Sequence, residues 1–124
     1  MIIGIGVDLC SISRIERAIG SQHFRREIFH RDEISYCESK GKKRAESYAA
    51  SFAAREAFSK ASGIHLGRVM FGKNFALIRD KDGKPEIKLS GDLIIEDADV
   101  FVSISHEDGF ACAMVVIERR NQQW

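Results

Sequence analysis

Two carboxylates in this chain occupy positions where apolar side chains are expected, and both could bind a cation. Asp8 directly follows the apolar segment 2–7, which we expect to form a short buried strand. Glu56 belongs to the helical segment 51–63, on the same face as Phe52. A carboxylate that packs against apolar side chains loses hydration, so it needs a partner, a metal ion or a raised pKa.

A lysine one helical turn after Glu56 allows two interpretations. Lys60 follows Glu56 at the i, i+4 spacing, which predicts an intrahelical ion pair worth about 0.2 to 0.5 kcal/mol. If Asp8 lies close by, the same residues predict a Mg²⁺ site, because Mg²⁺ prefers oxygen ligands and keeps positions free for substrate phosphates. Lys60 would then neutralise phosphate oxygens. The pattern alone leaves both the salt-bridged acid and the metal site open.

The other residue types with chemical potential give weaker signals. His106 comes where the strand 100–105 meets its turn, a place where histidines serve as structural hydrogen-bonding groups more often than as catalysts. The remaining histidines show no metal-binding spacing. Four arginines in the first third are interleaved with apolar residues, which indicates either a surface for an acidic partner or a solvated face. These arginines are Arg14, Arg17, Arg25 and Arg26.

The order of the expected elements predicts an α+β fold with an antiparallel sheet. We expect helices at 13–19, 24–29, 32–40 and 45–61, the first with Ser13 as a capping residue and the last ended by Gly63. Strands should follow at 69–79, 85–89, 100–105 and 110–117, forming two hairpins. Helices that precede strands, rather than alternate with them, are typical of this class, in which the helices pack on the sheet.

Length and composition restrict the class of protein. The 124 residues predict one domain over 1–124, and a net charge of +1 argues against nucleic-acid binding. The three cysteines are far apart and odd in number, so we expect reduced thiols in a cytoplasmic protein. Neither a signal peptide nor a membrane segment is expected, because the apolar runs are too short.

Four segments together resemble the holo-acyl-carrier-protein synthase family, the small phosphopantetheinyl transferases. They are GIGVDLCSISRI (4–15), FAAREAFSKASG (52–63), DGKPEI (82–87) and VSISHEDGFACAMVVI (102–117). Their order and spacing agree over nearly the whole chain. The resemblance implies transfer of 4′-phosphopantetheine from coenzyme A to a serine of apo acyl carrier protein, with release of adenosine 3′,5′-bisphosphate, in fatty acid biosynthesis.

The resemblance also implies roles for individual residues. Asp8 and Glu56 correspond to the family's Mg²⁺ ligands, and Lys60 to the lysine near the coenzyme phosphates. His106 corresponds to the histidine of the coenzyme site, and Gly63 and Pro85 stand where the family places residues around the nucleotide. The helix after the first strand is the family's docking element for the acidic carrier. Arg14 is therefore the first candidate for docking, followed by Arg17, Arg25 and Arg26.

One position departs from the family pattern, since Arg55 stands where lysine is common. Arginine stays protonated, so Arg55 cannot act as the general base. On the helical wheel it points away from Glu56, which predicts a surface or subunit contact. The family forms homotrimers with active sites at subunit interfaces, and the same is expected here. The alternatives are a transferase for a carrier of secondary metabolism and a non-catalytic nucleotide-binding module of the same fold.

Overall fold

A long alanine-rich helix forms the centre of the fold. The computed structural model describes residues 1–121. The elements in chain order are β1 (Ile2–Ser11), α1 (Ile12–Ala18), α2 (Gln22–Ile28), α3 (Arg31–Glu38), α4 (Arg44–Ser62), α5 (Leu66–Met70), β2 (Phe75–Arg79), β3 (Pro85–Leu89), β4 (Ala98–Glu107) and β5 (Phe110–Arg119). The expected α+β class with antiparallel strands is confirmed.

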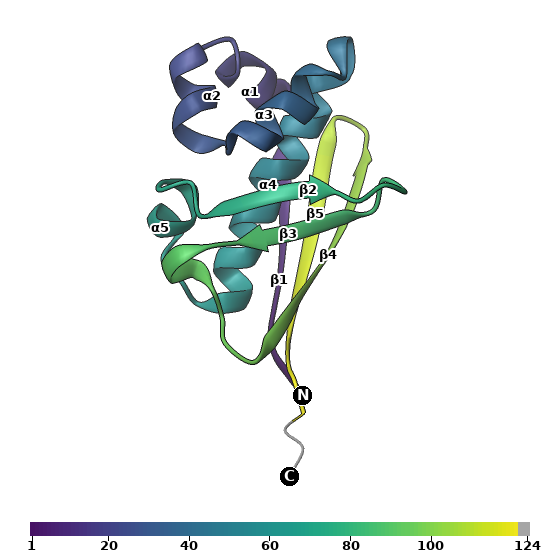
Figure 1. Cartoon of the computed structure of the whole chain (residues 1–124). Helices are drawn as coiled ribbons and strands as arrows, with labels where there is room; N and C mark the ends of the chain where they lie inside the picture. Colours follow the sequence, from purple (N-terminus) through teal and green to yellow (C-terminus); the bar gives the residue numbers. More distant parts are fainter. Residues whose placement is uncertain (122–124) are drawn as a thin grey trace.

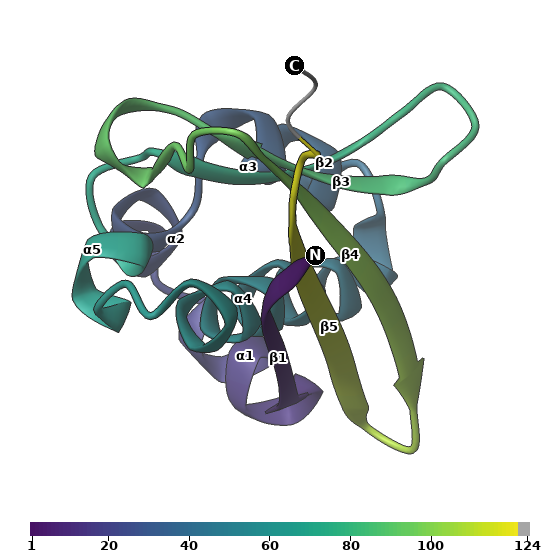
Figure 2. The ribbon, with the colours of Figure 1, turned by 90° about the horizontal axis from the view of Figure 1, so that it is seen from below.

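Helix α4 is enclosed on several sides. One side packs on the antiparallel sheet of order β1-β5-β4, and the β2–β3 hairpin crosses another (Figures 1 and 2). Helices α1 and α3 pack against its first half, and α5 against the second. The helix ends at Gly63, which has a left-handed φ of 76° as expected for a glycine C-cap. Small side chains along α4 let all these elements approach it, so the alanine content reflects burial on more than one side.

Two glycines of β1 bring the first strand close to α4. An added Cβ at Gly4 would overlap the carbonyl oxygen of Ala61, and one at Gly6 would overlap that of Ala57. Neither position therefore tolerates a side chain without moving the helix. The close approach places the next residue on the same face of the strand, Asp8, beside the second half of α4. These glycines thus have a packing role.

Several expected boundaries are wrong in detail. Strand β1 continues through Asp8 to Ser11, because its pairing with β5 persists that far. Helix α1 consequently starts at Ile12 with Ser11, not Ser13, as its cap. The expected strand over 69–79 is helical at its start, since α5 occupies that segment and β2 begins only at Phe75. Positive φ values at Gly72 and Lys73 interrupt any extended strand there.

No helix among residues 1–121 is long and apolar enough to cross a membrane.

Candidate active site

Asp8, Glu56 and Lys60 come together at the edge of the sheet formed by β1. The Lys60 ammonium donates to Oδ1 of Asp8 at 3.0 Å and to the carbonyl oxygen of Val7 at 3.0 Å. The Asp8 side chain is 12% exposed, whereas that of Lys60 is 57% exposed. The expected intrahelical pair of Lys60 with Glu56 is absent from the ion pairs of the described chain. Lys60 thus contacts the strand rather than its own helix.

Asp8 has one carboxylate oxygen that lacks a partner. Its Oδ2 is buried and accepts no hydrogen bond from any described residue. Burying such an atom without a partner costs about 1 to 3 kcal/mol, more if the group is charged. An unpartnered buried carboxylate oxygen, aimed at a second acid, is the arrangement expected of a ligand for a hard cation. The unpartnered Oδ2 of Asp8 is therefore the observation that makes the two acids suitable ligands for Mg²⁺.

Glu56 experiences the electrostatic field of that same carboxylate. Burial, and next the negative charge of Asp8, raise the pKa of Glu56, while Lys60 and Arg14 oppose the shift. The negative charge of Asp8 thus disfavours ionisation of Glu56, and a divalent cation beside them would favour it. No cluster of three or more histidine, cysteine or acidic side chains with metal-binding geometry occurs in residues 1–121. Asp8 and Glu56 are thus a pair of acids without a third such side chain grouped with them in the described part of the chain.

A cavity lies between Glu56 of α4 and the first helix, α1. It has a volume of about 200 Å³ and is lined by Glu56, Arg14 and a mainly apolar wall that includes Phe24 and Phe52. Arg14 is exposed and forms no ion pair with any described residue. Cys10 also lines this cavity, and burial raises its thiol pKa to about 11, which disfavours the reactive thiolate.

The arginines of the first third are not equivalent. Arg14, Arg17 and Arg26 are exposed, as a docking surface requires. Arg25 is partly buried, and its guanidinium donates to the carbonyl oxygen of Ile19 and lies 3.9 Å from Glu38. Arg25 therefore supports the packing between α1, α2 and α3 and is less accessible to a partner than Arg14.

Other predicted site residues lie at the opposite edge of the sheet. His106 is on β4 rather than in the turn, and its Nδ1 is 3.0 Å from Oε1 of Glu46. Pro85 lines a cavity of about 430 Å³ between β3 and β4. Gly63 remains near the first group, one turn beyond Lys60. A single chain thus brings Asp8, Glu56, Lys60 and Arg14 together but separates them from Pro85 and His106.

Arg55 contradicts its sequence prediction. Instead of reaching the surface it is 1% exposed, and it forms a two-pronged ion pair with Glu33 of α3. The wheel misplaced it because α4 is covered on this side too, by α3 and β2. The partner, Glu33, was missed altogether, although an acid within the apolar pattern of 28–37 was a signal of the same kind as Glu56.

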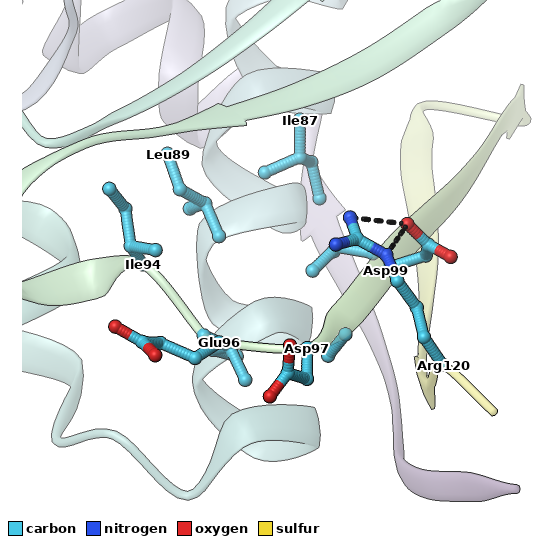
Figure 3. A pocket seen from close by; sticks show the side chains of 10 residues that line it. Ile87, Leu89, Ile94, Glu96, Asp97, Asp99 and Arg120 are labelled. Atoms are coloured by element: carbon cyan, nitrogen blue, oxygen red, sulfur yellow. Dashed lines mark hydrogen bonds and ion pairs between the residues drawn. The ribbon is translucent and has the colours of Figure 1, made fainter. Parts of the chain in front are cut away.

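A larger cavity near the chain termini is unsuited to phosphate. It measures about 510 Å³, and Figure 3 shows Glu96, Asp97 and Asp99 at its rim below the apolar side chains of Ile87 and Leu89. The guanidinium of Arg120, which lines this cavity, already donates two hydrogen bonds to Oδ1 of Asp99, at 2.9 and 3.0 Å. An acidic rim whose cation is engaged repels anionic ligands.

Comparisons with known proteins identify a family. The sequence matches the profile of the 4′-phosphopantetheinyl transferase superfamily over residues 4–115. It is 41% identical to the holo-[acyl-carrier-protein] synthase of Geobacter sp. strain M21, over 96% of this chain and 100% of the relative. It is 40% identical to that of Bacillus subtilis, over 96% and 98%.

Solved structures agree with the sequence relatives. The holo-(acyl-carrier-protein) synthase of Bacillus anthracis in complex with coenzyme A (3′,5′-ADP) has a TM-score of 0.82 at 35% identity, covering 96% of this chain and 98% of that one. The Helicobacter pylori enzyme in complex with coenzyme A has a TM-score of 0.77 at 32% identity, covering 92% and 99%. The chain therefore belongs to the 4′-phosphopantetheinyl transferase superfamily.

Proposed function

We propose that this protein transfers 4′-phosphopantetheine from coenzyme A to a serine of an apo acyl carrier protein and releases adenosine 3′,5′-bisphosphate. The observation that carries the proposal is the buried, half-satisfied carboxylate of Asp8 beside Glu56 and Lys60. Relatives named holo-[acyl-carrier-protein] synthases, and neighbours solved with coenzyme A, support the same reaction.

Asp8 and Glu56 are the residues that would hold Mg²⁺. When bound, Mg²⁺ withdraws negative charge from the pyrophosphate as the phosphorus–oxygen bond breaks. Lys60 is placed to contact the phosphates, because its exposed side chain extends from the same edge of the sheet. Arg55 takes no part in moving the serine proton, since its guanidinium is buried and paired with Glu33.

Arg14 is our candidate for docking the acidic carrier. It lines the same cavity as Glu56, so a carrier held at Arg14 presents its serine close to the two acids. Holding both reactants in line is the main contribution a protein makes to phosphoryl transfer. Arg17 is exposed on the same helix and would extend this surface, whereas Arg25 is more weakly supported.

We propose a homotrimer whose active sites lie between subunits. One face of the β1-β5-β4 sheet packs on α4, but the other exposes large apolar side chains. Ile5, Val7, Leu9, Phe101 and Met114 are each 48 to 67% exposed on that face. Covering this face with other copies would bring different edges of the sheet together. Asp8, Glu56, Lys60 and Gly63 of one subunit would then share coenzyme A with Pro85 and His106 of another.

The carrier of fatty acid biosynthesis is the proposed partner, with a carrier of secondary metabolism as the alternative. We further propose that the chain acts as one domain in the cytoplasm. The three free cysteines support a reducing compartment.

Mass spectrometry tests the activity directly. Apo carrier protein incubated with coenzyme A, Mg²⁺ and the enzyme should gain the mass of phosphopantetheine on its serine. Glu56→Gln should lose at least about 100-fold in turnover, because it removes one charged ligand of the metal. Glu118→Gln, at an exposed position of β5, is the matched control and should keep full activity. A lack of adduct on carriers of both pathways would leave the non-catalytic module as the better interpretation.

A further inference from the structure

Lys60 binds the carboxylate of Asp8, the same group that a metal ion would bind. Its ammonium is bound to two oxygens of the same strand, the Asp8 carboxylate and the Val7 carbonyl, both at 3.0 Å. The second Asp8 oxygen stays buried and unpartnered within the described chain. The carboxylate is therefore half neutralised by a side chain of the protein itself.

A lysine ammonium and Mg²⁺ compete for one carboxylate. Mg²⁺ binds oxygen at about 2.0 to 2.1 Å, which brings two positive charges close together if Lys60 keeps its hydrogen bond. Asp8 is nearly buried on a paired strand and cannot move away, whereas Lys60 is 57% exposed on a flexible stem. Of the two partners, only the lysine is free to leave.

We infer that Lys60 acts as a displaceable cation which lowers metal affinity until coenzyme A binds. The inference rests on the proposed function, because it assigns Asp8 as a metal ligand. Coenzyme phosphates attract Lys60 away from Asp8 and thereby release Oδ1, so that both carboxylate oxygens are available to the metal. Metal and coenzyme then strengthen each other's binding, since whatever removes Lys60 from Asp8 favours both.

A purely structural ion pair predicts a different result. If Lys60 only stabilises the contact between β1 and α4, its removal loosens the site and lowers metal affinity. If Lys60 is a competitor, its removal raises metal affinity in the absence of coenzyme. The sign of the change therefore separates the two roles.

The test measures binding of Mn²⁺ by the loss of the electron paramagnetic resonance signal of the free ion. Lys60→Met keeps the length of the side chain without its charge and should bind Mn²⁺ roughly tenfold more tightly than the wild type when no coenzyme is present. Coenzyme A should raise Mn²⁺ affinity in the wild type and do so less in the variant. Circular dichroism checks that the variant is folded.

Arg14→Met is the control for loss of charge alone. Arg14 also lowers the pKa of Glu56 through its charge but forms no hydrogen bond to Asp8. The Arg14→Met substitution should therefore raise Mn²⁺ affinity clearly less than Lys60→Met does. Equal increases in Mn²⁺ affinity in both variants, or no increase in Lys60→Met, would overturn the inference that Lys60 competes with the metal. Absence of Mn²⁺ binding in every protein, with and without coenzyme A, would overturn the metal site of the proposed function as well.

Discussion

Two of the ion pairs formed by helix α4 differ in how completely their carboxylate oxygens are hydrogen-bonded. Glu33 and Arg55 are both about 1% exposed, and each Glu33 oxygen accepts from Arg55 and from a backbone N–H, of His30 or of Leu77. Arg55 also donates to the carbonyl oxygen of Phe75 at 3.1 Å. Asp8 and Lys60 share one hydrogen bond, and the other Asp8 oxygen has no partner in residues 1–121.

The difference separates a pair with a structural role from one that fits the proposed site. The Glu33 carboxylate has no oxygen left for a ligand, and the Arg55 guanidinium lies 4.8 Å from the Phe75 ring centroid, which excludes water on that side. Asp8 retains a free lone-pair direction and a partner that can move. A buried carboxylate whose two oxygens are both hydrogen-bonded, like that of Glu33, indicates packing, even though Nε of Arg55 has no acceptor among residues 1–121; a buried carboxylate with an unpartnered oxygen indicates a site.

The largest effect should come from breaking the structural pair. Arg55→Met leaves the Glu33 carboxylate buried without a cation, so we expect the free energy of unfolding to fall by about 3 to 5 kcal/mol. Lys60→Met is the matched control and should lower it by less than about 1 kcal/mol, because that pair is largely exposed on the lysine side. Urea denaturation followed by circular dichroism measures both.

A double variant separates charge from packing if Arg55→Met folds poorly. Glu33→Gln combined with Arg55→Met removes the uncompensated charge, while the amide oxygen still accepts from a backbone N–H. It should recover more than half of the lost stability. Equal losses in the single and double variants would contradict the assignment of the cost to an unpaired charge.

The sequence singled out both residues of the Asp8–Lys60 pair, although it paired Lys60 with Glu56, whereas it missed Glu33 of the structural pair. Asp8, Glu56 and Lys60 stood out because each interrupts a local apolar pattern or follows another at a helical spacing. The partner of Arg55 is 22 residues away on another helix, and no local pattern links the two. The helical wheel also assumes that a helix has one buried face, an assumption that fails for α4.

The close contact between β1 and α4 was not predicted, although the small residues of both segments indicate it. Gly4 and Gly6 on alternate positions of a strand, and Ala57 and Ala61 one turn apart on a helix, are a signature of close backbone approach. That contact positions Asp8 beside α4, so it could have been used to place the acids together. The separation of Pro85 and His106 from Asp8 depends on the order of the strands, which local patterns do not specify.

Arg14 is a third charged group, and we expect its substitution to have an intermediate effect, on the apparent KM for the carrier. It is exposed, lacks an ion pair in the described chain and lines the cavity with Glu56, which is why we propose it for carrier docking. Arg14→Glu should raise the apparent KM for the carrier about tenfold and leave that for coenzyme A nearly unchanged. Arg31→Glu, at a residue whose side chain is 92% exposed on α3, is the control. Equal rises in both KM values would refute docking at Arg14.

The smallest effect concerns stability and pH at Glu56. Burial and the charge of Asp8 raise its pKa above the ordinary 4.5, so the folded protein binds this proton more tightly than the unfolded chain. The ionised form therefore destabilises the fold, with a cost that appears as the pH rises above 4.5 and through the raised pKa. In metal-free buffer Glu56→Gln should raise the melting temperature slightly at pH 7, and the gain should vanish near pH 4. Glu118→Gln should show no such pH dependence. A gain that persists at pH 4 would mean that Glu56 is not strained by its ionisation, and the contrast between the two pairs would then rest on Asp8 alone.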